Sequence, residues 1–363
     1  MSRNSRSLPE TRLRSFDTSR NNVSSPAAGE FFRRDQSMLK AGVIGCGYWG
    51  PNIIRNLDAL PGVELIYVAD LNTEQLAKQK ALYPYIKTTT NYLDIITDRA
   101  IDIVLIVTPV NTHYRFAKEA LTNGKHVFVE KPLTDSVQTS KELCKLADSM
   151  NLTLMVGHTF VYTGAVRKMK EIIDSGELGT IRYITSQRLN LGLYQKDINV
   201  LWDLAPHDLS IADYLIGSQI TKIKAYGHRD INPQLEDTAF LNLTYSTGEK
   251  VYIMNSWLYP EKVRKMAIVG TKGMMIYDDM EPEKKIKVFH KHVDFSKSEI
   301  SYQYENGKEY FPELILKEAL SVELSHFTDC VLNNKEPLSS GNKGLNVVKV
   351  LEESDLLLRR NQA

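Results

Sequence analysis

The chain has 363 residues, of which 42% are hydrophobic and 25% charged, and its formal net charge is +1. This length predicts two domains, because it exceeds what one ordinary core accommodates, and the near-zero charge gives no reason to expect nucleic acid or an anionic membrane as a partner. No apolar run is long enough to span a bilayer, and the distant cysteines Cys46, Cys144 and Cys330 favour reduced thiols in the cytoplasm over a disulfide framework or a zinc site.

Residues 1–38 differ from the rest of the chain in composition. They are rich in Arg and Ser, lack Lys and hold few large apolar side chains. Such a segment cannot bury enough apolar surface to fold alone, so we expect a disordered tail. A targeting peptide is the alternative, but the acidic residues Glu10, Asp17 and Glu30 argue against it.

Short apolar runs and helical patterns alternate between residues 39 and 158. The strand-like runs are LKAGVIG, VELIYVAD, IDIVLIV, HVFVE and LTLMVGH. The run IDIVLIV is almost entirely β-branched or Leu, as expected for a strand buried on both faces of a parallel sheet. The repeated strand–helix–strand order with short connections predicts a doubly wound Rossmann domain over residues 39–158.

From residue 159 onward the pattern changes. Two helices are expected around Ala165–Ile173 and Asp203–Leu215, and IRYITSQRL between them is strand-like. Further strand-like runs then follow at close spacing: ITKIKAYG, TAFLNLTY, KVYIMNSWL, VRKMAIVG and GMMIYDD. Neighbouring strands without helices between them, with STGEK as a hairpin turn, predict a large and mostly antiparallel open sheet. The fold class is therefore α/β, with an α+β substrate and oligomerisation domain over residues 159–345 and a C-terminal helix over residues 346–363.

The glycines Gly45, Gly47 and Gly50 form a G-x-G-x-x-G pattern between the first strand and the first helix. In a dinucleotide site the first glycine permits the turn, the second admits the pyrophosphate, and the third lets helix and strand pack closely. Asp70 ends the second strand 20 residues after Gly50, where a carboxylate binds ribose hydroxyls and repels a 2′-phosphate. The pattern thus predicts NAD rather than NADP, with a structural turn as the alternative; Tyr48 and Trp49 complete the candidate loop.

The loop TPVNTHY follows the third long strand, at an edge where open α/β sheets bind ligands. Asn111 or Thr112 is a candidate N-cap for the next helix. The alternative to a loop and cap is a cofactor contact, in which Thr108 and Pro109 line the nicotinamide ribose with Asn111 and His113 nearby.

The next strand ends in EKPL, at Glu130 and Lys131. The following proline biases Lys131 to an extended backbone, which directs its ammonium toward the same crevice. A lysine at such a place is either a surface charge or the group that polarises a substrate hydroxyl beside the cofactor. We include both residues in the candidate cofactor site.

Asp203 and His207 are four residues apart in VLWDLAPHDLSIADYLIG, hence on one face of a predicted helix. A carboxylate beside an imidazole orients the ring, and a histidine with a pKa near ~6.5 accepts a hydroxyl proton at neutral pH. The alternative is an ordinary surface pair. No third ligand at a suitable spacing supports a metal site.

The set GVIGCGYWG, Asp70, TPVNTHY, EKPL and DLAPHD resembles the glucose–fructose oxidoreductase / inositol dehydrogenase (Gfo/Idh/MocA) family, from about Leu39 to Arg360. The resemblance implies a Rossmann domain that binds NAD(P) and a second domain whose open sheet packs in oligomer interfaces, as a homo-dimer or homo-tetramer. It also implies that Lys131, Asp203 and His207 form the catalytic group, with the carboxylate holding the imidazole.

The segments RLNLG and WDLAPHD resemble the branch that acts on nucleotide-linked sugars in surface polysaccharide synthesis. The residues expected to contact substrate are His158, Tyr162, Arg167, Arg188, Asn190 and Trp202. Because a sugar diphosphate needs cations, Lys168 and Lys196 are further candidates, and Tyr162 or Tyr194 is a candidate to share the acid/base role.

The leading hypothesis is an NAD-dependent sugar dehydrogenase acting on CH–OH. A free polyol, inositol or aldose is the alternative substrate, and a redox-neutral glycosidase or lyase is the alternative reaction. A third hypothesis is a non-catalytic NAD-binding regulator. The presence of all three predicted catalytic residues argues against it.

Overall fold

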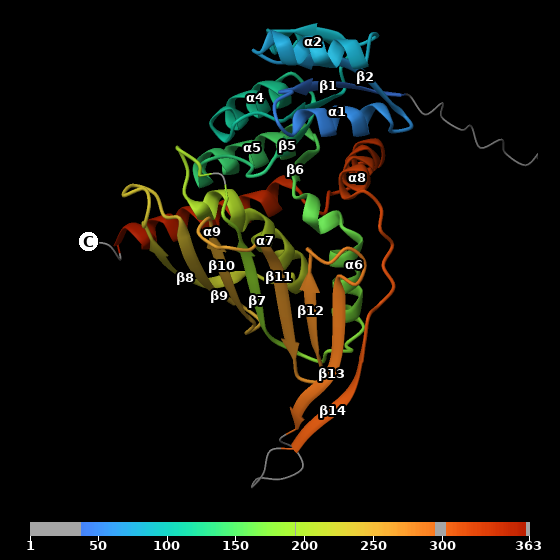
Figure 1. Cartoon of the computed structure of the whole chain (residues 1–363). Coiled ribbons are helices and arrows are strands. Elements are labelled where there is room, and N and C mark those ends of the chain that lie inside the picture. The colour runs from blue at the N-terminus through green and yellow to red at the C-terminus, as the bar shows by residue number, and fades with distance from the viewer. Residues whose placement is uncertain (1–37, 193, 295–302, 361–363) are drawn as a thin grey trace, which may run out of the picture. The chain divides into compact units, whose positions relative to one another are not determined.

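The computed structural model describes residues 38–192, 194–294 and 303–360. The predicted disordered tail lies outside the described residues, apart from Met38. The strands of the described part form two sheets, one with six strands and one with eight (Figure 1). Within that part, none of the helices is both long enough and apolar enough to cross a membrane.

The six-stranded sheet is parallel and has the order β3-β2-β1-β4-β5-β6. Its strands are β1 (Leu39–Ile44), β2 (Val63–Ala69), β3 (Lys87–Thr89), β4 (Ile103–Ile106), β5 (His126–Glu130) and β6 (Leu154–Gly157). Its connecting helices are α1 (Gly50–Asp58), α2 (Thr73–Leu82), α3 (Leu93–Ile96), α4 (Val110–Thr122) and α5 (Val137–Met150). All four residues of β4 are fully buried, as its unbroken apolar pattern predicts for a central parallel strand. The predicted Rossmann architecture is confirmed.

The loop before α4 differs from the prediction. The helix begins at Val110 and its N-cap is Pro109, so neither Asn111 nor Thr112 is the cap. The hydroxyl of Thr112 instead donates to the carbonyl of Pro109 at 2.7 Å. The helix can start this early because proline has no N–H to leave unpaired and its fixed φ suits a helix entrance.

The eight-stranded sheet has the order β14-β13-β12-β11-β7-β10-β9-β8. Its strands are β7 (Ile181–Leu189), β8 (Ile220–His228), β9 (Thr238–Tyr245), β10 (Lys250–Ser256), β11 (Val263–Gly270), β12 (Met274–Asp278), β13 (Ile286–Asp294) and β14 (Gln303–Tyr310). Every neighbouring pair is antiparallel except β7 with β10, which confirms the predicted mostly antiparallel sheet. The edge strand β14 and its neighbour β13 were not predicted.

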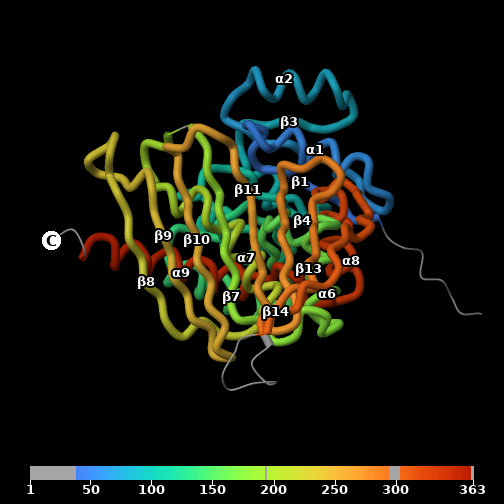
Figure 2. Tube along the Cα trace, turned by 60° about the horizontal axis from the view of Figure 1, so that its bottom comes forward, coloured from blue at the N-terminus to red at the C-terminus, as the bar shows by residue number. Residues whose placement is uncertain are grey.

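Helices cover one face of this sheet, and the other face is open in Figure 2. The covering helices are α6 (Gly164–Asp174), α7 (Val200–Ile216) and α9 (Gly341–Arg360). The helix α7 contacts β7, β9 and β10, and α9 contacts β8. Inward-facing aliphatic residues such as Ile184, Leu241 and Ile253 alternate with outward-facing polar or aromatic ones, which is the period of a half-covered sheet.

The last two helices return to the first sheet. The helix α8 (Ala319–Asn333) contacts α1 and the 3₁₀ helix η1 (Thr159–Tyr162), and α9 contacts β6 and α5. The chain thus packs segments from its far end beside the strand ends that carry the predicted site. The domain boundaries at residues 158 and 345 stay predictions.

Candidate functional site

The glycine turn after β1 has the geometry of a phosphate-binding loop. Gly45 has a φ of 102°, and a Cβ there would lie 2.3 Å from the carbonyl oxygen of Val107. A Cβ at Gly50 would lie 2.5 Å from the carbonyl oxygen of Gly45, whereas a Cβ at Gly47 would meet nothing within 4 Å. The turn is therefore closed toward the protein and open at Gly47, beside the N-terminus of α1 where free N–H groups favour an anion.

Asp70 lies directly beside this turn. One carboxylate oxygen accepts from the N–H of Cys46 at 2.7 Å, and the other accepts from the N–H of Asn72 at 2.8 Å. These bonds fix the carboxylate at the end of β2, next to the first glycine. Tyr48 is almost fully exposed and Trp49 half-exposed, so both side chains lie on the open side of the loop. The arrangement fits the pyrophosphate and ribose of NAD.

His113 was predicted to contact the cofactor, but its ring is buried. Nδ1 lies 2.9 Å from the carbonyl oxygen of Pro132, and Nε2 lies 2.8 Å from that of Thr108. Burial lowers the pKa of His113. The side chain therefore ties the loop after β4 to the loop after β5, and it supports the edge where Pro109 and Asn111 lie.

Lys131 connects the first sheet to α7. Its ammonium donates to the backbone carbonyl of Asp203 at 2.9 Å and lies 4.0 Å from the carboxylate oxygen Oδ1 of the same residue. Burial lowers the pKa of Lys131, while the Asp203 and Glu130 carboxylates oppose that shift. Lys131 thus contacts the helix that carries both Asp203 and His207.

The expected hydrogen bond between Asp203 and His207 is not what the structure shows. Oδ2 of Asp203 accepts from the indole N–H of Trp257 at 3.0 Å, while Nδ1 of His207 is buried without a hydrogen-bond partner in the described part of the chain. The sequence spacing placed both groups on one face of α7 correctly, but the indole and the ammonium of Lys131 take up the carboxylate.

His207 lies among apolar and cationic groups. Its ring contacts the Phe160 ring edge-to-face, with centroids 4.9 Å apart. Burial and then the positive charge of Lys131 lower the pKa of His207 well below 6.5. Its imidazole is therefore neutral at neutral pH, which is the form that accepts a proton.

Two further carboxyl groups are buried near Lys131. Burial raises the pKa of Glu130 to about 7, against the lowering effect of Lys131. Burial and then the neighbouring Glu130 raise the pKa of Glu323, on α8, well above its usual range. Thr159 donates to Glu323 at 2.7 Å, but Oε1 of each glutamate has no hydrogen-bond partner within the described residues. The pair brings negative charge beneath the predicted nicotinamide site only when it is deprotonated.

Arg188 was predicted to bind substrate phosphate, but its charge is already paired. Its guanidinium lies 3.2 Å from the carboxylate of Asp208, and both side chains are almost fully buried. Ser186 and Asn255 also donate to Asp208. The guanidinium packs over the Phe160 ring at 4.6 Å, so this residue holds β7, α7 and η1 together.

Arg167 and Tyr162 lie in a second packed cluster. The guanidinium of Arg167 stacks over the rings of Tyr162 and Tyr214, at 5.3 and 5.5 Å. The hydroxyl of Tyr162 lies 3.0 Å from that of Ser339, and burial raises the pKa of the phenol. Neither side chain ends freely in the region of His207.

The remaining candidates are Lys168, Lys196 and Tyr194, and each has a different environment. Lys168 forms a surface ion pair with Glu171. Lys196 is exposed, at the loop before α7. Tyr194 packs its ring against Trp257, with centroids 5.3 Å apart. The tyrosine thus lies beside the indole that contacts Asp203.

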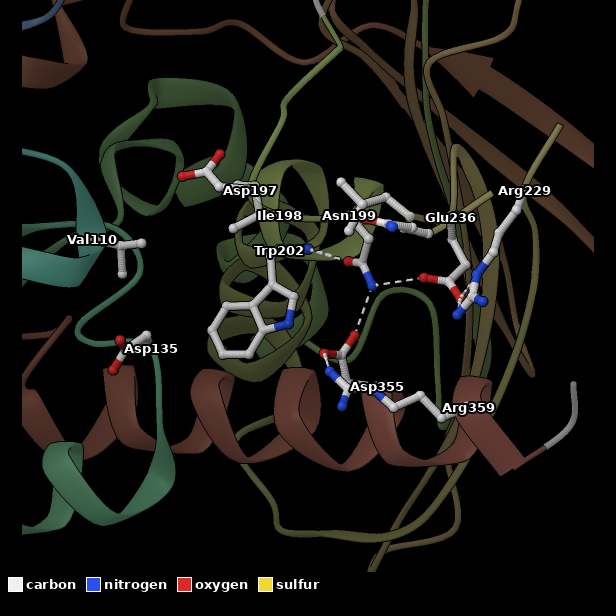
Figure 3. Close-up of a pocket in the computed structure, with 12 residues that line it drawn as sticks. Val110, Asp135, Asp197, Ile198, Asn199, Trp202, Arg229, Glu236, Asp355 and Arg359 are labelled. Carbon is white, nitrogen blue, oxygen red and sulfur yellow. Dashed lines mark hydrogen bonds and ion pairs between the residues drawn. The ribbon is translucent and has the colours of Figure 1, made fainter. Parts of the chain in front are cut away.

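Trp202 and Asn190 lie at the ends of their elements. Trp202 lines a pocket of about 250 Å³ with Val110 and Asp135, which follow β4 and the EKP loop (Figure 3). The amide of Asn199 spans the pocket wall by donating to Glu236 at 3.0 Å and to Asp355 at 2.7 Å.

Two predicted substrate residues lie just after strands. The backbone N–H of Asn190, after β7, donates to the carbonyl of Ser256 at 3.1 Å. His158, which follows β6, is buried.

Two groups near the predicted reaction centre were missed by sequence reasoning: Trp257, which donates to Asp203, and Arg264, which lies near His207. Arg264 pairs with Arg188 in the register of β11 and β7, and its guanidinium lies 5.9 Å from the Phe160 ring centroid. The pairing of β10 and β11 with β7 brings Trp257 and Arg264 to α7, so no local motif could reveal them.

Comparison with known proteins gives matches over most of the chain. A family model described as "Oxidoreductase family, NAD-binding Rossmann fold" matches residues 39–158, and one for the GFO/IDH/MocA C-terminal domain matches residues 166–276. The scyllo-inositol 2-dehydrogenase (NAD(+)) of Bacillus subtilis (strain 168) is 28% identical over 321 residues, which cover 84% of this chain and 89% of that protein.

Solved structures give the same fold. The UDP-N-acetylglucosamine 3-dehydrogenase GnnA from Acidithiobacillus ferrooxidans has a TM-score of 0.74 at 23% identity, over 88% of this chain and 97% of that chain. An oxidoreductase from Agrobacterium radiobacter in complex with NAD+, L-tartaric acid and magnesium has a TM-score of 0.74 at 19% identity, over 89% and 97%. The family model for residues 39–158 confirms the prediction of NAD as the cofactor.

Proposed function

The chain belongs to the GFO/IDH/MocA family of NAD-binding oxidoreductases, and from that premise we propose that it oxidises or reduces one carbon of a nucleotide-linked hexose. The observation that carries the proposal is the contact of Lys131, at the end of β5, with Asp203, in the first turn of α7. It joins the strand ends beside the glycine turn to the helix that holds His207.

The proposed chemistry follows from the charges of these groups. His207 is neutral at neutral pH and accepts the hydroxyl proton of the substrate in the oxidation direction. The ammonium of Lys131 stabilises the negative charge that develops on that oxygen. Asp203 keeps the ammonium in place, since it contacts Lys131 through both its carbonyl and its carboxylate. NAD, when bound, supplies the hydride acceptor or donor.

A nucleotide-linked substrate is supported by cations near the proposed reaction centre. Arg264 is partly exposed and lies by Phe160 and His207, and its only described ion pair, with Asp279, is long at 3.5 Å. Lys196 lies exposed before α7. We propose that these two side chains approach the diphosphate, in place of Arg188, which is paired with Asp208, and Arg167, which stacks on two tyrosine rings. A role in surface polysaccharide synthesis belongs to the same proposal.

A free polyol or inositol is the second candidate substrate. The relative from Bacillus subtilis is named scyllo-inositol 2-dehydrogenase, and it aligns with most of this chain. The burial of Arg188 in an ion pair with Asp208 also favours a neutral ligand, because it removes one of the cations expected to bind phosphate.

We further propose a homo-dimer or homo-tetramer that forms through the open face of the eight-stranded sheet. Exposed aromatic side chains lie on this face at Tyr183, Tyr226, Phe240 and Tyr252. Met254 pairs with Phe240 in the strand register and extends the same apolar area. Large apolar patches of this kind commonly mark interfaces between protein copies. Light scattering of the wild type and of Tyr252→Glu tests the assembly, and an unchanged mass would contradict the proposed interface.

A cytoplasmic location is part of the proposal. The three cysteines are free and buried, and burial raises the pKa of each thiol, so none is poised as a reactive thiolate. This state suits a reducing compartment.

The test is nicotinamide absorbance of the purified protein with NAD against nucleotide sugars, free aldoses and inositols. NADH formation with one nucleotide sugar supports the leading proposal, and formation only with a free polyol supports the second. Product formation without net NADH would identify redox-neutral chemistry. NAD binding that persists without turnover in both the wild type and His207→Gln would point to a regulator.

A further inference from the structure

His158, the residue that follows β6, is an unexplained buried polar group. Its side chain is 1% exposed, and neither ring nitrogen has a hydrogen-bond partner among the described residues. Buried polar groups are nearly always paired, so an imidazole with two unused nitrogens needs a reason beyond packing. The proposed dehydrogenase reaction does not use it as a base, because that role falls to His207.

A cavity lies next to this ring. It has a volume of about 120 Å³ and is lined by His158, Ser210, Tyr214 and Ser339, among others. Lys343 of α9 and Asp213 of α7 also line it and form an ion pair of 2.9 Å. The cavity is large enough for water, and its hydroxyl and charged groups supply the partners that a buried water needs.

The cavity follows the face of α7 that carries His207. Residues 207, 210 and 214 are spaced i, i+3 and i+7, so they lie in one line along the helix. Ser210 donates to the carbonyl of His207 at 2.9 Å. Phe160, two residues after His158, contacts the His207 ring at 4.9 Å. His158 lines the cavity, and it is also close enough to His207 to lower the pKa of that residue, after burial and the charges of Lys131 and Arg188.

A proton that His207 accepts from the substrate needs a route to water. Among the described residues, Nδ1 of His207 is buried without a partner, and Asp203, the partner expected from the sequence, is bound to Trp257 and Lys131. We propose that His158 relays the reaction proton between His207 and water in the cavity beside Asp213 and Lys343. This inference rests on the proposed function, since only a dehydrogenase or reductase exchanges one proton per turnover at that base.

The relay balances without a further reactant. In oxidation the substrate carbon gives its hydride to nicotinamide, and the hydroxyl gives its proton to His207, which leaves a carbonyl. Because neither ring nitrogen of His158 contacts His207 directly, a water between the two rings carries the proton from His207 to one nitrogen of His158. His158 releases a proton from its other nitrogen to water in the cavity, so no electrons move. A neutral imidazole carries one acceptor and one donor nitrogen, as this exchange requires.

The charges around His158 keep it neutral. Burial, and then the ammonium of Lys131, lower the pKa of His158 to about 3. Asp213 and Lys343 face the cavity as a neutral pair, and Glu323 of α8 reaches the neighbouring residue Thr159. The ring is therefore neutral before and after each proton transfer, and it does not remain protonated between turnovers.

The first test records NADH absorbance and a pH indicator in the same stopped-flow experiment, with the substrate that the wild type oxidises. We expect proton release in step with hydride transfer in the wild type. In His158→Gln we expect hydride transfer in the first turnover to change little, proton release to lag and kcat to fall about tenfold or more, with recovery on adding imidazole. Leu338 lines the cavity, and Leu338→Trp should fill it with the larger side chain. Proton release should then lag behind hydride transfer although His158 is intact.

His126→Gln is the matched control, because His126 lies at the opposite end of β5 and does not line the cavity. An equal slowing of hydride and proton steps in His158→Gln, with a raised KM, would make the residue a substrate contact and overturn the relay. A high-resolution structure of the NAD-bound protein tests the route without turnover. Water within hydrogen-bonding distance of His158 is expected there, and a dry cavity overturns the relay whether or not the proposed substrate class is correct.

Discussion

The ammonium of Lys131 donates a 2.9 Å hydrogen bond to the backbone carbonyl of Asp203 and lies 4.0 Å from the carboxylate of the same residue. A side chain from the end of a Rossmann strand is thereby fixed against the first turn of α7. This contact explains how two segments 72 residues apart form one proposed reaction centre. A partly buried cation held beside a reacting oxygen is worth more than a fully solvated one, because water screens it less.

Replacing Lys131 with methionine should remove that cation while keeping much of its bulk. We expect kcat to fall about 10²- to 10³-fold with little change in NAD affinity, because the lost interaction forms mainly in the transition state. Steady-state kinetics and NAD titration by fluorescence measure the two effects. Lys118→Met, at an exposed position on α4, is the control. Turnover that survives in Lys131→Met would remove the residue from the mechanism.

The pH dependence of oxidation should reflect the lowered pKa of His207. Since burial and Lys131 favour the neutral ring, the active base form persists as the pH falls through 6.5, and kcat/KM should decline only at more acidic pH. Glu130, next to Lys131, has a pKa of about 7, and its titration would add a second inflection to the dependence of kcat/KM on pH. A pH profile of Glu130→Gln separates the two groups, because only the limb that remains there can belong to His207. A remaining limb above pH 6.5 would contradict the assignment.

The glycine turn offers a matched pair of variants. Gly47→Ala adds a methyl group where nothing lies within 4 Å, so the fold should be unchanged while NAD affinity drops about tenfold or more. Gly45→Ala places a methyl group 2.3 Å from a backbone oxygen at a φ of 102°, which should lower the free energy of unfolding by about 3 kcal/mol or more. Thermal unfolding and NAD titration of both variants check this division. Equal effects of the two substitutions on NAD affinity and stability would contradict it.

Much of this site is predictable from the sequence because its parts are local. Gly45, Asp70 and Lys131 each follow a strand directly, and parallel strands bring their carboxyl ends to one edge. The buried pattern of β4 and the alternation in β9 identify both sheets. In these segments the periodicity, the turn chemistry and the fold all agree.

The remaining features depend on long-range contacts that no local pattern contains. Trp257 reaches Asp203 only because β10 lies beside β7, and Arg264 reaches Phe160 only through strand pairing. The same limit explains the assignment of Arg188 to substrate: an arginine in a strand has the same local sequence whether it meets phosphate or a buried Asp208. Edge strand β14 is nearly all polar and exposed, so it lacks the apolar alternation that predicts a strand.

The buried pair of Arg188 and Asp208 should be structural. Arg188→Met leaves the Asp208 carboxylate without its cation, which should lower the free energy of unfolding by about 3–5 kcal/mol. The double variant Arg188→Met with Asp208→Asn removes both charges and should recover most of that loss. Chemical denaturation of the two variants measures the difference. A stable Arg188→Met protein with a strongly raised KM would instead restore the substrate-binding interpretation.

Glu323 should make stability depend on pH in a direction opposite to that of an ordinary carboxylate. Its pKa is raised in the folded protein above its ordinary value of 4.5, so the folded state holds a proton that the unfolded state releases. The free energy of unfolding should therefore decrease as the pH rises above about 4.5. Glu323→Gln keeps an acceptor for the Thr159 hydroxyl and removes the titration.

The variant should match the wild type in stability near pH 4 and exceed it by about 1–3 kcal/mol at pH 8, where the wild type must either hold the proton or bury a charge. Denaturant unfolding at the two pH values measures this difference. Glu353→Gln, at an exposed position of α9, should show no such dependence. If Glu323→Gln instead destabilises the protein more at pH 8 than at pH 4, the carboxylate is charged in the fold, and a cation or a ligand must approach it from the side of Glu130.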